Sequence, residues 1–214
     1  ISSAGLYTAP AAVPGAPAVT VRATSVANPA SYAQATVTIT APPPPTTSLA
    51  NARFLEQSSF GPSPTSLARV AQLGFSAYLD EQMALPETPI LTPSDNSMST
   101  LRQWVLYNYG AANDQLRQRV AYSLGQIIVT SGNKLIYPGE ILPWLRLLSK
   151  HAFGNYRDLL RDVSMSPSMG KYLDLANSMK PGLAGGANEN YARELMQLFT
   201  IGLWELNDDG SLVI

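Results

Sequence analysis

Apolar and polar residues alternate in two short stretches near the start of the chain. The first covers residues 18–24 and the second residues 35–40, and in both Ala, Val and Ile exchange with Thr. A period of two is typical of strands that bury one face. Residues 26–30 lie between the two stretches and include Asn28 and Pro29, which favour a turn. The pattern therefore predicts two antiparallel strands.

From Leu49 onward, apolar residues recur at spacings of three and four, which predicts helices. Asn113 or Asp114 is placed to cap the helix that starts at residue 115. Residues 204–214 alternate around an Asp-Gly turn and predict a hairpin cut off by the end of the chain. The predicted helices cover about 51–58, 64–83, 100–109, 115–129, 140–150, 155–163, 168–176 and 188–201.

Four prolines, Pro42 to Pro45, separate the strand region from the helical region. Consecutive prolines favour polyproline II, a stiff extended spacer. We interpret residues 42–48 as a proline-rich linker, with a β domain over residues 1–41 and a helical domain over residues 49–214. The expected fold class is mainly α, with the helical domain incomplete at its C-terminus.

The composition of the chain excludes several classes of function and site. The chain has 214 residues, 45% of them hydrophobic, and a formal net charge of −1. No basic stripe is present, so we expect no nucleic-acid partner. No apolar run reaches the roughly 18 residues of a transmembrane segment. The absence of cysteine excludes disulfides, thiol nucleophiles and cysteine metal sites. Because the first residue is Ile1, missing targeting signals carry no information.

The strand region resembles the C-terminal end of bacterial immunoglobulin-like domains. The resemblance is carried by Gly-Leu-Tyr-Thr-Ala-Pro at residues 5–10, the Val-Thr-Val strand, and the closing Ala-Thr-Val-Thr-Ile strand at residues 35–39. It implies a remnant of a β-sandwich whose other strands lie upstream. Such domains are spacers or adhesion modules on secreted and surface proteins.

The helical region resembles DUF1800, a family of bacterial proteins without an established activity. Three segments carry the resemblance: residues 52–62, which contain Ala-Arg-Phe-Leu-Glu-Gln; residues 116–127, which contain Leu-Arg-Gln-Arg-Val-Ala-Tyr; and residues 188–202, which contain Asn-Glu-Asn-Tyr-Ala-Arg-Glu-Leu. The resemblance covers only the N-terminal part of the family and implies an exported protein, located in the periplasm, at the cell surface or outside the cell.

The segment that begins at Asn188 is also the richest in candidate chemistry. On a helix, Glu189 and Arg193 are spaced i, i+4, which favours an ion pair on one face, and Glu194 lies at the border of the apolar face. In a structural interpretation the cluster caps the helix and Glu194 accepts hydrogen bonds from Arg117 or Arg119. In a functional interpretation Glu194 or Glu189 is a general base or hard-metal ligand, and Arg193 holds a polar substrate group.

Other motifs favour structural interpretations. His151 is the only histidine and follows Lys150 at a predicted helix end, so we interpret it as a helix-terminal residue. Ser168 and Lys171 match Ser-x-x-Lys, but their companion motifs are misordered or absent, and we reject that catalytic interpretation. Residues 208–210 predict a hairpin turn rather than a calcium loop. Trp104, Tyr107 and Tyr109 could form a sugar platform, although core packing is favoured.

Three hypotheses remain open. The first is a non-catalytic surface protein whose helical domain binds a protein or polysaccharide partner. The second is a carboxylate-dependent hydrolase of an envelope or extracellular polymer, with Glu194 and Glu189 as its acids. The third is a scaffold that assists the export or assembly of another protein. Cofactors and metals are not specified by the sequence.

Overall fold

The computed structural model describes residues 18–39, 47–179 and 186–213. Two antiparallel strands, β1 (Ala18–Thr24) and β2 (Tyr32–Thr38), form its sheet, with Ala18 paired to Thr38 and Thr24 to Tyr32. The predicted turn lies between them, where Ser25 N–H donates to the Ser31 carbonyl at 2.9 Å. The second strand starts before the predicted residue 35, because its pairing with β1 already includes Tyr32. A two-stranded sheet is shown, and a β-sandwich is not.

Several predictions fall outside the described residues. They concern the segment before residue 18, which includes Gly5 to Pro10, and the four prolines from Pro42 to Pro45.

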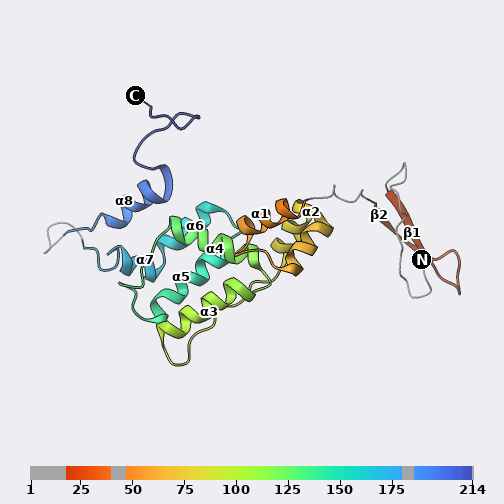
Figure 1. Ribbon diagram of the computed structural model, residues 1–214, viewed down its shortest axis with the longest axis horizontal. Helices are drawn as coiled ribbons and strands as arrows, with labels where there is room; N and C mark the ends of the chain where they lie inside the picture. The colour runs from red at the N-terminus through yellow and green to blue at the C-terminus, as the bar shows by residue number, and fades with distance from the viewer. Residues whose placement is uncertain (1–17, 40–46, 180–185, 214) are drawn as a thin grey trace.

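The remaining named elements are helices, as predicted, and Figure 1 shows α1 to α7 packed into one helical body. Their N-termini are capped by polar side chains in several cases, such as Thr47, which accepts from Ala50 N–H at 3.1 Å, and Asn155, which accepts from Arg157 N–H at 2.9 Å. In chain order they are α1 (Ser48–Ser58), α2 (Pro64–Ala84), α3 (Met98–Ala111), α4 (Gln115–Ile127), α5 (Pro138–Lys150), α6 (Tyr156–Ser164), α7 (Pro167–Tyr172), α8 (Asn190–Met196) and the π-helix η1 (Gln197–Ile201).

The helix α2 is broken at Gly74, which was predicted to lie inside a continuous helix. Gly74 is buried and has φ 74° and ψ 171°, a conformation open almost only to glycine. The two halves of α2 therefore change direction there. Arg69 and Glu81, one from each half, form an ion pair that joins them.

The largest buried cluster lies among α4, α5, α6, α7 and the α8–η1 segment. Its centre includes Trp144, Leu159, Met169, Tyr191 and Phe199, each of which is nearly inaccessible to solvent. A second cluster joins α1 to α2 around Leu55, Val70 and Tyr78, and a third joins α3 to α5 around Leu101 and Leu142. Burial of these apolar side chains holds the helices together.

The α7 helix is shorter than predicted. It ends at Tyr172, and Asp174 and Asn177 beyond it have positive φ of 57° and 62°. In the described residues, no helix has the length and hydropathy needed to cross a bilayer.

Candidate functional site

The predicted cluster lies at the start of α8, and its three charged residues form one short chain of ion pairs. The Arg193 guanidinium is 3.6 Å from Glu189 Oε1 and 3.7 Å from Glu194 Oε1, and it also donates to Asn190 Oδ1 at 2.9 Å. Glu189 is exposed and Arg193 is half-exposed. The helix ion pair between Glu189 and Arg193 is therefore present, in a solvated setting where such pairs contribute little stability.

Glu194 differs from its neighbours because only 20% of its side chain is exposed. Its Oε2 atom is buried and accepts no hydrogen bond from the described residues. Arg117 and Arg119, the expected hydrogen-bond donors to Glu194, contact other residues. Arg117 lies 3.6 Å from Asp114 Oδ2, and Arg119 lies over the rings of Phe60 and Tyr122. Arg193 is thus the cation that accompanies Glu194.

The helix that follows was predicted to be a regular α-helix, and the structure shows a π turn instead. Gly202 N–H donates to the Gln197 carbonyl at 2.8 Å, and Thr200 Oγ1 donates to the Leu195 carbonyl at 2.7 Å. The wider turn separates residues that an α-helix would place on one arc. Phe199 is buried, while its neighbour Leu198 is 63% exposed.

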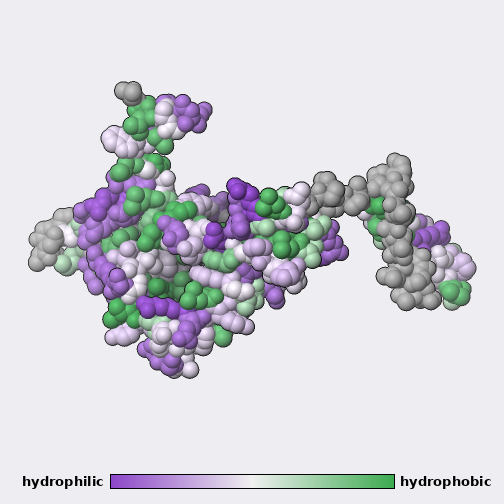
Figure 2. Space-filling view, in the orientation of Figure 1, coloured by the Kyte–Doolittle hydropathy of each residue, from purple (hydrophilic) through white to green (hydrophobic). Residues whose placement is uncertain are grey.

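Exposed apolar side chains continue from this turn to residue 213, in a stretch that we call the apolar C-terminal segment (residues 196–213). Figure 1 shows it projecting from the helical body after α8, and Figure 2 shows hydrophobic residues along it. Residues 201–206 enclose a surface hollow of about 500 Å³. The large exposed side chains are those of Met196, Leu198, Ile201, Leu203, Trp204, Leu206, Leu212 and Val213.

The predicted hairpin around the Asp-Gly turn lies within this segment. Leu206 pairs with Leu212, Asn207 N–H donates to the Ser211 carbonyl at 2.8 Å, and Gly210 has φ 83°. Hydrogen bonds from the Ser211 hydroxyl and N–H lower the pKa of Asp209 below its usual value of 3.8. The turn therefore keeps Asp209 ionised, and hydrophilic residues mark this tip in Figure 2.

His151 lies at the end of α5, as predicted, and contacts α6. Its Nε2 is 2.7 Å from Asp162 Oδ2, and Lys150 Nζ is 2.9 Å from the same oxygen. Lys150 and then His151 lower the pKa of Asp162 from 3.8 to about 2. The Lys150–Asp162 ion pair and the His151–Asp162 hydrogen bond join the two helices.

Ser168 and Lys171 do not form a catalytic pair. The Ser168 hydroxyl donates to the Glu140 carbonyl at 2.6 Å, and Lys171 pairs with the Glu140 carboxylate. Both residues hold α7 to α5. Among the described residues, no three His, Asp or Glu side chains are grouped so that they could hold a metal ion.

Of the three aromatic residues on α3, Tyr109 packs as predicted and Tyr107 does not. Tyr109 stacks on Phe60 with ring centroids 4.1 Å apart and meets Tyr122 edge-on. Tyr107 is 71% exposed and, with the half-buried Trp104, lines a shallow hollow beside Leu91. The prediction of core packing is therefore wrong for Tyr107.

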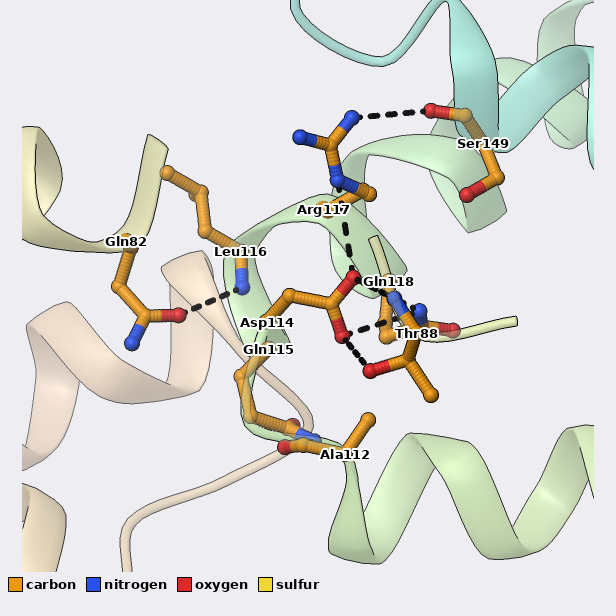
Figure 3. Close-up of polar contacts among 9 residues, drawn as sticks. All are labelled: Gln82, Thr88, Ala112, Asp114, Gln115, Leu116, Arg117, Gln118 and Ser149. Carbon is orange, nitrogen blue, oxygen red and sulfur yellow. Dashed lines mark hydrogen bonds and ion pairs between the residues drawn. The ribbon is translucent and has the colours of Figure 1, made fainter. Parts of the chain in front are cut away.

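A buried polar network centred on Asp114 was not predicted (Figure 3). Asp114 is fully buried and accepts from the Thr88 hydroxyl at 2.5 Å, the Thr88 N–H at 3.0 Å and Gln118 Nε2 at 3.3 Å. Arg117 balances its charge and donates to the Ser149 carbonyl at 3.2 Å. Asp114 precedes α4 but makes no capping bond, so its predicted role was wrong. The only sequence signal was a carboxylate three residues before an arginine.

Comparison with known proteins identifies the family. The family model described as "Protein of unknown function (DUF1800)" matches residues 53–210, which is well over half of the chain. Searches of curated proteins and of solved structures each gave no match. The matched region contains α2 to α8 and most of the apolar C-terminal segment. This chain belongs to the DUF1800 family.

Proposed function

We propose that the helical domain is a binding module that docks a basic amphipathic segment of another protein on the apolar C-terminal segment. The observation that carries the proposal is the run of eight large exposed apolar side chains between Met196 and Val213. Large apolar side chains that are exposed close together along one segment mark an interaction site, because each gains about 1.5–3 kcal/mol when it leaves water.

The shape of the segment suits an inserted side chain. Ile201, Leu203, Trp204 and Leu206 surround the hollow of about 500 Å³, and Trp204 is 69% exposed. Tryptophan is enriched among the residues that dominate binding energy, because a large ring fills a pocket and excludes water. An amphipathic helix that lays its apolar face in such a hollow is a recurring mode of recognition.

The charge of the segment selects the partner. Residues 197–213 include Glu205, Asp208 and Asp209 and contain no Lys or Arg. An apolar surface bordered by carboxylates is complementary to an apolar face bordered by Lys or Arg. Like charges on the partner would be repelled, so an acidic amphipathic segment is disfavoured.

A pair of matched peptides tests the proposal. Both form amphipathic helices with the same Leu and Phe residues on one face, and one carries Lys where the other carries Glu. Binding of the labelled peptides to the full chain is followed by fluorescence anisotropy. We expect the Lys peptide to bind more tightly and its affinity to fall with salt, because the surface charges are screened.

Substitutions locate the binding surface. Trp204→Ala is expected to raise the Kd of the Lys peptide at least about tenfold. Leu106→Ala is the control, because Leu106 is 66% exposed on α3, away from the segment. Equal binding of both peptides, or equal effects of the two substitutions, would overturn the proposal. Saturable self-association lost in Trp204→Ala would instead assign the surface to a second copy of the chain, and loss of Lys-peptide binding in a chain extended past residue 214 would assign it to the rest of the helical domain.

The buried Glu194 Oε2 atom favours the carboxylate-dependent hydrolase as a second candidate. This oxygen accepts no hydrogen bond from the described residues, and Arg193 lies close enough to hold a polar group. This candidate requires Glu194→Gln to abolish turnover of an envelope or extracellular polymer while the melting temperature stays nearly unchanged. Turnover that survives the substitution eliminates it.

Export is a further part of the proposal. Its support is the resemblance of the strand region to immunoglobulin-like spacers, together with the alternation of Thr and Val that the hairpin of β1 and β2 carries. The test is fractionation of the native host. Recovery in the cytoplasm alone would contradict it.

A further inference from the structure

A cavity of about 210 Å³ lies between α3, α4 and α5. Its apolar wall comes from facing sides of α3 and α5 and includes Val105, Ile141, Trp144, Leu145 and Leu148. Trp144 and Leu148 also belong to the largest buried cluster, so the cavity opens directly into the core of the domain. It is separate from the apolar C-terminal segment.

One polar group in this wall is left without a partner. Ser149 is 2% exposed, and its Oγ is buried and forms no hydrogen bond with the described residues. The Ser149 carbonyl is already engaged, because it accepts from Arg117. A buried hydroxyl without a partner is unfavourable, so a ligand that offers it a hydrogen bond gains affinity.

Gly125 on α4 leaves part of the space open. A Cβ atom added at Gly125 would lie 3.3 Å from Leu148 Cδ1, tighter than an ordinary contact. Glycine is less favourable than alanine inside a helix. Its presence here keeps α4 and α5 from filling the cavity.

We propose that this cavity binds a small neutral molecule built on one aromatic or aliphatic ring, with one hydroxyl or carbonyl group that pairs with Ser149. The size fits, because an apolar cavity of about 150 Å³ is enough for benzene. The ligand is neutral because the cavity's lining, which lies entirely within the described residues, contains no charged side chain. Tyr109 and Tyr122 add aromatic surface to the same wall.

Phenol and benzene are suitable probes because they differ by one hydroxyl. Each is titrated into the full chain and followed by NMR, with the Trp144 indole N–H signal as the local reporter. We expect saturable binding of both, with phenol tighter by about fivefold, the worth of one net hydrogen bond. Ser149→Ala removes this preference and leaves benzene affinity unchanged.

A matched pair of glycine substitutions controls for folding. Gly125→Ala is expected to weaken both probes several-fold, because the added methyl and the displaced Leu148 occupy the cavity. Gly110→Ala in α3 adds a methyl with nothing within 4 Å and leaves both affinities unchanged. No saturable shift of Trp144 with either probe overturns the site. Equal effects of the two substitutions, or a phenol preference that survives Ser149→Ala, overturns its assigned position.

Discussion

Thr88 donates both its hydroxyl and its backbone N–H to the two carboxylate oxygens of Asp114, at 2.5 Å and 3.0 Å. The two residues are 26 positions apart, and Thr88 lies in the loop between α2 and α3. Because Asp114 is fully buried, this contact fixes the loop against the start of α4. Gln82 supports the same junction, since its Oε1 accepts from Leu116 N–H at 3.3 Å.

Asp114→Ala is expected to cost about 3–5 kcal/mol of unfolding free energy. The substitution leaves Arg117 without its carboxylate and removes the acceptor of Thr88, and uncompensated buried charge is costly. Urea denaturation of the full chain measures the change. Asn113→Ala, at the exposed neighbouring position, is the control and should stay within about 0.5 kcal/mol. Similar losses in both variants would contradict the central position of Asp114.

Gly74→Ala is expected to destabilise the domain by about 1–3 kcal/mol. At φ 74° and ψ 171° a Cβ atom is strained, although the same substitution normally stabilises a helix. Thermal unfolding distinguishes the two effects. Gly110→Ala, in α3, serves as the comparison and should be neutral or stabilising. An increase in stability for Gly74→Ala would show that α2 is continuous.

The low pKa of Asp162 predicts that the folded protein loses stability in acid. Its pKa is about 2 in the folded protein and 3.8 in its ordinary state, because Lys150 and His151 stabilise the carboxylate. The folded state therefore binds fewer protons, and the stabilisation is complete above pH 3.8 and is lost as the pH falls through about 2. Asp162→Asn should differ from the wild type above this window and converge with it below.

Urea denaturation between pH 2 and 5 measures that convergence. Asp80→Asn, at an exposed position of α2, controls for the removal of one carboxylate. A difference between wild type and Asp162→Asn that is independent of pH would show that charge is not the cause.

The helices were predictable because a single local signal, the apolar period, specifies each of them. The break at Gly74 was not, since apolar residues recur at a spacing of three both before it, at Leu67, Val70 and Leu73, and after it, at Phe75 and Tyr78. The π turn was hidden for a similar reason. Leu198 and Phe199 are both apolar, and only the structure shows that Phe199 faces the core while Leu198 is exposed.

The candidate site was predictable in part. The pair of Glu189 and Arg193 depends on helix spacing alone, and it forms. The position of Glu194 depends on neighbours far away in the chain, and its two expected partners, Arg117 and Arg119, contact other residues. Long-range polar contacts of this kind have no periodic signature, so the Asp114 network and the Ser149 cavity required the structure.

The central claim is that the apolar C-terminal segment is a binding surface and not part of the folded core. Substitutions at the adjacent residues Leu198 and Phe199 test this claim, because the Leu198 side chain is 63% exposed and the Phe199 side chain only 5%. Denaturation and Lys-peptide binding are measured for Leu198→Ser and Phe199→Ala in the full chain. We predict that Leu198→Ser changes stability by no more than about 0.5 kcal/mol and weakens binding at least tenfold, while Phe199→Ala costs about 3–5 kcal/mol. A loss of stability in Leu198→Ser as large as that in Phe199→Ala, with binding unchanged, would contradict the claim.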